Sequence, residues 1–460
     1  MRPVRFLLIL CLAAAACAQD ARPIGDRARD YLAAMLKLDS SNPPGNETRV
    51  AEYLREIAAA NGIECELLGA EPARLNFVAR VRGSGRARPL LLMAHSDVVP
   101  AERSQWTVDP FGAEIRNGYL YGRGAEDTKD LLAAEMAVLV ELKKSGVKLS
   151  RDVILLAESD EEAGSTGMRW MIDNAWDKID AEFALNESGA AADTPSGTRV
   201  YHIQTSEKIP TRVTLVAHGT AGHGAVPRAD NAVLHLVRAT ARLAAADQPV
   251  KLDATTRAYF KGISRLPDYS WLAPLLAKLE SPATALQTAN QIRARDADLD
   301  TLLRTTVVPT MLNAGTKINV IPSTAEAQID VRRLPGESKE EVIARIRRMV
   351  GDDAVEVMPA VGQEMPAAPA SPLTTALYTT MEQVLKQSHP RALVVPIMSR
   401  GASDSSLVRA KGVPAYGVPL FLGEPGGDRS HGNDERRSLE NLRAGTDLLL
   451  KIVLAVAEER

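Results

Sequence analysis

Residues 90–97 read Leu-Leu-Leu-Met-Ala-His-Ser-Asp, an unbroken apolar run that ends abruptly in polar residues. Apolar residues without alternation are typical of a strand buried on both faces, as in a parallel sheet covered by helices. Open α/β sheets bind their ligands beyond the carboxyl ends of such strands. His95 and Asp97 are therefore predicted to lie in a functional site.

Two more apolar runs end in acidic residues. Residues 153–157 lead into Asp160-Glu161-Glu162, and residues 183–185 lead into Asn186-Glu187. Helical patterns alternate with these runs, so the sequence predicts an α/β fold with a mostly parallel, twisted sheet and helices on both faces. We expect further strands at residues 75–81, 393–398 and 415–420, and helices at residues 24–37, 47–60, 130–144 and 439–458.

A different pattern begins near residue 208. Residues 212–217 and 325–331 alternate polar and apolar side chains, which is typical of a sheet with one solvated face. A helical pattern spans residues 231–245, and Ser338 with Glu341 forms a capping box that opens another helix. These elements predict a compact α+β domain with two helices on one face of an antiparallel sheet.

The length of the chain agrees with more than one domain. At 460 residues it exceeds the size at which a single hydrophobic core usually stops growing. We predict a catalytic domain made of residues 19–207 and 360–460, interrupted by an inserted α+β domain at residues 208–359. Residues 252–304 carry helical patches but no readable motif.

The charge composition argues against a nucleic-acid partner. Charged residues make up 25% of the chain and the formal net charge is -3, as in an ordinary globular protein. The basic residues are scattered and form no stripe that could follow a phosphate backbone.

The N-terminus has the features of an export signal. Arg2 and Arg5 precede the apolar run at residues 6–16, which is long enough for a signal-peptide core but too short to cross a bilayer easily. We predict a signal peptide at residues 1–18 and an exported protein, periplasmic or secreted. Alternatively the signal is of the lipoprotein type, and Cys17 becomes a lipid anchor at a membrane.

The polar residues at the strand ends form a donor set of nitrogen and oxygen without sulfur. Such a set suits Zn²⁺, with Co²⁺ or Mn²⁺ as alternatives. Asp127 lies in a glycine-punctuated loop and could bridge two ions through its two oxygens. His95 and Glu187 would complete the coordination of one ion, and Glu162 and His431 that of the other.

Two acidic residues remain for roles beside the ions. Asp97 is predicted to bind the second imidazole nitrogen of His95 and fix its orientation. Glu161 is placed to take a proton from the attacking water and pass it to the leaving amine. Taken singly, each residue has a structural interpretation, such as a helix N-cap for Asp127 or a solvated loop pair for Glu161 and Glu162. Their joint occurrence favours metal binding.

These motifs resemble those of the dinuclear zinc peptidases typified by aminoacylase, glutamate carboxypeptidase, carboxypeptidase S and succinyl-diaminopimelate desuccinylase. The resemblance covers nearly the whole mature chain. The chain departs from the family's pattern at Asn186, where many relatives have aspartate. The motifs occur in order as His-Ser-Asp-Val-Val-Pro at 95–100, Gly-Arg-Gly-Ala-Glu-Asp-Thr-Lys at 122–129, Asp-Glu-Glu-Ala-Gly at 160–164, Asn-Glu at 186–187 and Ser-His-Gly-Asn-Asp-Glu at 430–435.

The resemblance implies that the inserted domain is a ferredoxin-like lid that closes over the site and mediates dimerisation. His223 matches the lid histidine that helps to stabilise the oxyanion. Asn319 and Arg332 match substrate-binding positions, and a guanidinium can hold a carboxylate with two hydrogen bonds. Without the motif, Arg332 would be interpreted as a surface strand charge. Gly401 opens a loop that loosely matches the one shaping the substrate pocket.

Together with the predicted export signal, the resemblance implies an exported dinuclear zinc metallopeptidase or amidohydrolase that cleaves a peptide or N-acyl amide bond beside an amino acid with a free carboxylate. Carboxypeptidase or dipeptidase action and aminoacylase action use the same residues, so both remain open. One rival hypothesis is a non-catalytic binding protein on the same fold, which should have lost ligands or the base. Another is a one-metal enzyme in which Glu162 or His431 lies outside the coordination sphere.

Overall fold

The computed structural model describes residues 22–361 and 364–459. The chain divides into two compact units, one formed by Met1–Asp180 with Leu420–Arg460 and the other by Ala181–Pro419. The signal peptide and the alternative lipid anchor lie outside the described residues, so both stay predictions. Among the described residues, no helix is both long and apolar enough to cross a membrane.

The first unit contains four neighbouring strands in the order β1 (Glu64–Leu68), β2 (Asn76–Val81), β6 (Val153–Glu158) and β3 (Leu90–His95). Strands β3 and β6 are parallel, whereas β2 is antiparallel to both β1 and β6. Every residue of β3 and β6 is buried, which requires cover on both faces. The predicted α/β class is therefore confirmed.

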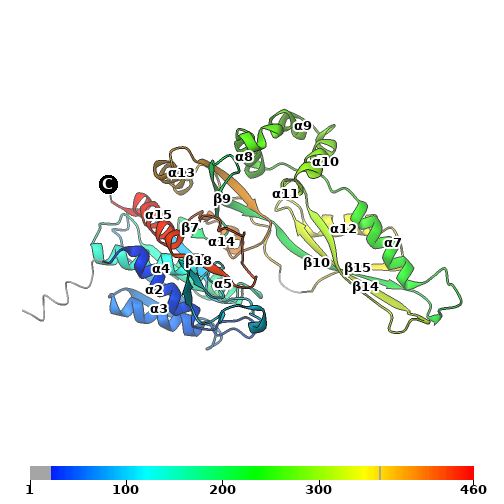
Figure 1. Ribbon diagram of the computed structural model, residues 1–460, viewed down its shortest axis with the longest axis horizontal. Coiled ribbons are helices and arrows are strands. Elements are labelled where there is room, and N and C mark those ends of the chain that lie inside the picture. Colours follow the sequence, from blue (N-terminus) through cyan, green and yellow to red (C-terminus); the bar gives the residue numbers. More distant parts are fainter. Residues whose placement is uncertain (1–21, 362–363, 460) are drawn as a thin grey trace, which may run out of the picture. The chain divides into compact units, whose positions relative to one another are not determined.

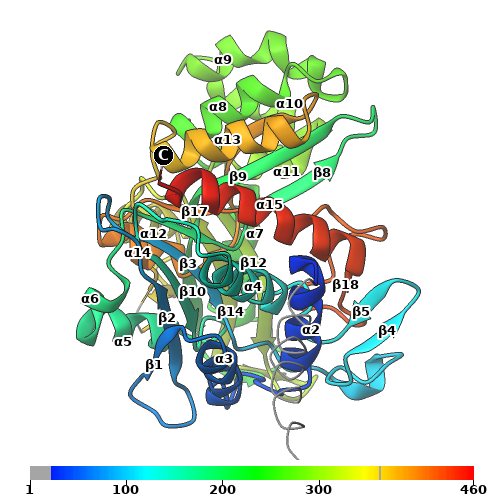
Figure 2. The same cartoon turned by 90° about the vertical axis from the view of Figure 1, so that its left-hand side faces the viewer.

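Helices cover these strands. Helix α4 (Lys129–Ser145) packs against β3 and β6, and α3 (Thr48–Ala60) packs against β1 and β2. Helix α4 ends at Gly146, whose φ of 64° lies in the left-handed region that glycine adopts without strain. Helices α2 (Ile24–Leu36) and α15 (Leu439–Ala457) pack against α4 and against each other (Figure 2). The smaller elements of this unit are η1 (Arg103–Gln105), β4 (Glu114–Arg116), β5 (Tyr119–Tyr121), α5 (Thr166–Asn174), α6 (Trp176–Ile179) and β18 (Arg436–Ser438).

The second unit begins with strands that also pair in parallel. Strand β7 (Phe183–Asn186) lies parallel to β17 (Ala415–Gly417), and β9 (Arg199–Glu207) lies parallel to β16 (Leu393–Ser399). Strand β8 (Ala190–Asp193) pairs with β9. Helix α13 (Ala376–Ser388) packs against β16, and α14 (Ser405–Ala410) packs against β7 and β17.

An antiparallel sheet makes up another part of the second unit. Its strand order is β12 (Thr306–Ala314), β14 (Thr324–Arg333), β10 (Ile209–His218) and β15 (Val355–Pro359). Helices α7 (Ala232–Ala245) and α12 (Lys339–Val350) lie side by side against this sheet (Figure 1). This α+β arrangement lies within residues 208–359, for which the inserted domain is predicted.

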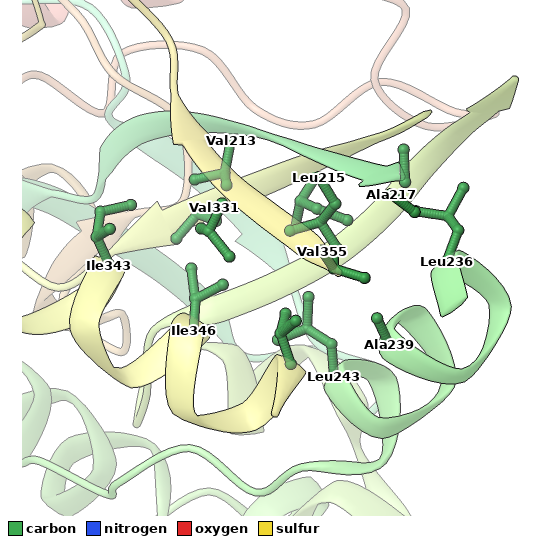
Figure 3. Packing of buried hydrophobic residues seen from close by; sticks show 14 of the residues in the cluster. Val213, Leu215, Ala217, Leu236, Ala239, Leu243, Val331, Ile343, Ile346 and Val355 are labelled. Carbon is green, nitrogen blue, oxygen red and sulfur yellow. The ribbon is translucent and has the colours of Figure 1, made fainter. Parts of the chain in front are cut away.

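One apolar core holds this sheet and its two helices together. Val213 and Leu215 of β10 belong to one buried cluster with Leu236 of α7 and with Ile343 and Ile346 of α12 (Figure 3). Buried and more exposed residues alternate along β10 and β14, as predicted for a sheet with one solvated face. The predicted capping box of α12 is also confirmed, since the Ser338 hydroxyl accepts the Glu341 N–H at 3.2 Å and the Glu341 carboxylate accepts the Ser338 N–H at 3.1 Å.

Two parts of this unit carried no readable pattern in the sequence. Strand β12 is an edge strand whose residues are mostly exposed, so apolar side chains do not alternate along it. Residues 252–304 form a cluster of short helices that packs on β9 and β16 through an apolar core of its own. These helices are α8 (Ala254–Ile263), η2 (Pro267–Leu275), α9 (Leu276–Glu280), α10 (Ala285–Arg295) and α11 (Ala297–Thr301).

Candidate metal centre

The parallel pairing of β3 and β6 brings predicted ligands to one edge. In the register of the two strands His95 lies opposite Glu158, so both strands end at the same level. Asp160 then adopts a left-handed backbone conformation with φ 67°, which is strained for a residue other than glycine. Directly after this turn, the backbone N–H groups of Glu161 and Glu162 donate to the carboxylate of Asp97, which follows β3.

Asp127 lies between two histidines. Its Oδ1 is 3.0 Å from His95 Nε2, and its Oδ2 is 3.1 Å from His431 Nε2. Glu162 Oε1 lies 3.0 Å from the same His431 nitrogen. The potential ligand atoms of His95, Asp127 and Glu162 all lie within 4.8 Å of one another. Because each oxygen of Asp127 faces a different imidazole, the carboxylate fits two ions, and the nitrogen and oxygen donors suit zinc.

The charges of this cluster favour a cation. Hydrogen bonds that His431 donates to Asp127 and Glu162 raise the pKa of His431 to about 10. Burial favours the neutral acid of Asp127, but hydrogen bonds from His431 and His95 outweigh it and hold the pKa of Asp127 well below its usual range. The Asp127 carboxylate therefore stays ionised and attracts positive charge, whether a proton on His431 or a divalent ion.

Asp97 connects β3 to the turn after β6. It is fully buried, and His95 Nδ1 lies 3.0 Å from its backbone oxygen and 3.5 Å from its Oδ1. The Asp97 carboxylate also accepts the N–H groups of Glu161 and Glu162, each at 3.1 Å, and the side-chain amide of Asn42 at 2.8 Å. Because Nδ1 is held as the donor, Nε2 is the nitrogen left for a metal ion, as the orienting role of Asp97 requires.

Burial opposes the ionised form of Asp97. The hydrogen bonds from His95, Asn42 and the Glu162 N–H outweigh this effect and keep the pKa of Asp97 below its usual value. Asn42 was not singled out by the sequence, because its position in a turn-rich segment gives no sign of a partner so distant in the chain.

Glu161 lies at the edge of the donor set. It is half-buried, and its carboxylate oxygen is within 4.8 Å of a His95 nitrogen. This place fits the predicted proton shuttle, and it also fits a further ligand. Replacement of Glu161 separates the two roles, as argued in the Discussion.

Glu435 organises the loop that carries Asp127, a role that the sequence did not indicate. Its carboxylate accepts the backbone N–H groups of Gly124, Glu126 and Asp127 at 3.0, 2.7 and 3.1 Å. It also pairs with Arg123, and both side chains are buried. The position of Glu435 in a polar motif was the only hint that the sequence offered, and the sequence does not reveal its partners.

The predicted ligand Glu187 belongs to the second unit. It is half-buried and directly follows β7, whose last residue is Asn186. The Asn186 amide donates a hydrogen bond to the Ser405 hydroxyl at 2.9 Å. This contact gives Asn186 a structural role, and the ligand role of Glu187 stays a prediction.

His223 and Asn319 lie together on a small ribbon of the second unit. Strands β11 (Gly222–His223) and β13 (Val320–Ile321) pair there, and the Gly224 N–H donates to the Asn319 carbonyl at 2.8 Å. His223 is exposed, and its Nδ1 accepts the Ala225 N–H at 3.1 Å. In this tautomer Nε2 carries the proton, as a donor to an oxyanion must.

Arg332 and Gly401, the other predicted substrate-binding residues, lie elsewhere in the same unit. Arg332 is half-buried near the end of β14, and its Nε donates to Asp330 Oδ2 at 3.0 Å. The Gly401 N–H donates to the Ser399 hydroxyl at 3.1 Å, which forms a turn directly after β16. Their contacts with substrate stay predictions.

The fold and this donor set are those of a metal-dependent hydrolase. The chain matches the profile of peptidase family M20/M25/M40 over residues 91–455, and it belongs to that family. The predicted relationship to the dinuclear zinc peptidases is thereby confirmed.

Relatives of known name support the same class. The chain is 28% identical over 379 residues to a probable carboxypeptidase S-like 2 of Dictyostelium discoideum. The aligned region covers 80% of this chain and 71% of that protein. It is 26% identical over 374 residues to the N-fatty-acyl-amino acid synthase/hydrolase PM20D1 of Homo sapiens, covering 80% and 74%.

A solved structure shares the fold. An M20 family metallo-carboxypeptidase from Sulfolobus solfataricus gives a TM-score of 0.70 at 20% identity and covers 92% of this chain and 98% of its own.

Proposed function

We propose that this chain binds two divalent metal ions, with zinc as the preferred ion, and cleaves a peptide or N-acyl amide bond beside an amino acid with a free carboxylate. The observation that carries the proposal is the position of Asp127, whose two oxygens lie 3.0 and 3.1 Å from different histidines. One carboxylate shared in this way supports two ions rather than one.

The chemistry follows from the residues around the cluster. Bound there, divalent ions would polarise the scissile carbonyl and lower the pKa of the attacking water. The Glu161 carboxylate accepts the proton of that water and delivers it to the leaving amine. Asp97 holds both the His95 ring and the Glu161 backbone in place, and His223 Nε2–H donates to the developing oxyanion.

Arg332 supplies the preference for a free carboxylate in this proposal. Replacing Arg332 with leucine is expected to lower kcat/KM for an N-acyl amino acid about 10²-fold, since a charge-assisted pair is lost. The corresponding amino acid amide, which offers no carboxylate, should lose much less. Release of free amino acid from both substrates measures the difference in metal-loaded protein.

The exposed Arg348 on α12 offers a matched control, since Arg348→Leu also removes a guanidinium from this part of the chain. An equal loss for the acid and its amide would rule out the carboxylate role of Arg332. A panel of N-acyl amino acids and dipeptides then separates aminoacylase from dipeptidase action. If the unmodified protein cleaves none of them with its metal ions bound, the hypothesis of a binding protein is preferred.

The proposed homodimer uses the antiparallel sheet of the second unit. Strand β12 is at the edge of this sheet and exposes Val308, Met311 and Leu312, and the neighbouring helix α7 exposes Leu234 and Val237. Unpaired edges with apolar side chains are typical of surfaces that pair with a second chain. These observations support a dimer of two copies of this chain.

Leu312→Arg is expected to convert this dimer to a monomer, because it places a charge within the apolar edge. Leu312 is 64% exposed, so the substitution disturbs no core. Ile115→Arg, at a residue 53% exposed on β4, is the control and should leave the mass unchanged. Light scattering after size-exclusion chromatography gives the mass, and a monomeric unmodified protein would contradict the proposal.

A further inference from the structure

The junction between β9 and β10 is made of two buried charged residues. Strand β9 ends at Glu207 and β10 begins at Ile209, so Lys208 alone separates two long strands. Glu207 is 4% exposed and Lys208 is 1% exposed. Charged side chains are rarely buried without a specific partner, so the contacts of this pair have a structural purpose.

Lys208 holds the first end of the loop that carries Gly401. Its backbone N–H donates to the Ser399 carbonyl at 3.0 Å, where β16 ends and the loop begins. Its ammonium donates to the Arg304 carbonyl at 2.8 Å, directly after the cluster of short helices. Burial, followed by the charge of Arg400, lowers the pKa of Lys208 to about 7, so this contact forms against a cost of desolvation.

Glu207 holds the other end of the same loop. Its carboxylate accepts the Ser403 hydroxyl at 2.9 Å and the Gln204 amide at 3.0 Å. It also forms a buried ion pair with Arg409 of α14, the helix that follows the loop. Burial raises the pKa of Glu207, but Arg409 and Ser403 act against this effect and favour the carboxylate.

We propose that Glu207 and Lys208 are positioning residues that clamp the loop from Ser399 to Ser403 at both ends, so that the loop and strand β10 keep a fixed relation. This inference rests on the proposed function in one respect, namely that Gly401 in this loop shapes the substrate pocket. Strand β10, which begins directly after Lys208, pairs with both β14 and β15, so the clamp ties the loop to the start of that sheet.

The clamp predicts that a single hydroxyl controls the order of the loop. Ser403→Ala removes the bond to Glu207 and the longer bond from the Ser405 N–H at 3.3 Å, but leaves the ion pair with Arg409, so the fold should be retained. We expect amide hydrogen exchange in residues 400–404 to become roughly 3- to 10-fold faster, an effect of the size of a lost hydrogen bond. In the metal-loaded full chain, KM should rise by a similar factor with kcat nearly unchanged, and Ser403→Thr, which keeps a hydroxyl, should restore both.

Thr205→Val is the matched control. The Thr205 hydroxyl is buried two residues before Glu207 and bonds the Thr255 hydroxyl at 2.8 Å, away from the loop. It should leave both exchange in residues 400–404 and KM unchanged. Unchanged exchange in Ser403→Ala, or equal acceleration by Thr205→Val, would overturn the clamp. Amide hydrogen exchange can be measured whether or not the protein is active. A protein inactive on every substrate would therefore refute the proposed function, but the exchange rates would still test the clamp.

Discussion

Exchange of Glu161 for glutamine is expected to lower kcat by about 10²- to 10⁴-fold, the usual effect of losing a general base. Glutamine has nearly the same shape and keeps the backbone N–H that donates to Asp97 Oδ1 at 3.1 Å. The turn after β6 is therefore expected to keep its structure, and the number of bound metal ions should not change. Steady-state rates together with metal analysis of the purified protein test both statements.

The neighbouring Glu162→Gln variant is the control for Glu161. Glu162 Oε1 contacts His431 Nε2 at 3.0 Å, within the donor set, so its replacement should reduce metal content as well as activity. If instead Glu161→Gln loses an ion, Glu161 is a ligand and the proton shuttle must be another group. A variant that keeps both its ions and its full activity would exclude either role.

Replacement of Asp127 by alanine is expected to lower kcat on the order of 10³-fold and to cause loss of bound metal, because the ligand proposed to be shared between the two ions is removed. The two histidines then lose the carboxylate that faces both of them at 3.0 and 3.1 Å. Titration of the metal-free protein with zinc, followed by calorimetry, gives the number and affinity of the remaining sites.

Glu126→Gln tests whether this effect is specific to Asp127. Glu126 is the preceding carboxylate in the same loop, and its Oε2 accepts the Arg429 N–H at 2.7 Å instead of facing the histidines. Its replacement should leave the zinc stoichiometry intact. An Asp127→Ala protein that still binds two ions with unchanged affinity would show that Asp127 does not bridge them.

The parts of the fold with a periodic signal could be predicted. Strand β3 is recognisable because every residue of it is apolar up to His95, and α12 because Ser338 and Glu341 cap it. Strand β12 was missed since an exposed edge strand has no face that must be apolar. Residues 252–304 were expected only as helical patches without a motif, because each short helix contributes only a few residues to their shared core.

The candidate site shows the same division. His95, Asp127, Glu162 and His431 were singled out by residue type and by the motifs around them, and the structure brings them together. Glu435 was not assigned a role, because its function depends on backbone N–H groups about three hundred residues earlier. Contacts of this kind have no local pattern in a sequence.

This long-range contact has a consequence for biosynthesis. The loop of Asp127 is held by Glu435, and both Glu435 and His431 are synthesised about three hundred residues after Asp127. A nascent chain therefore has β3, β6 and α4 available long before its donor set can close. The donor set around Asp127 can therefore form only after residue 435 has been synthesised.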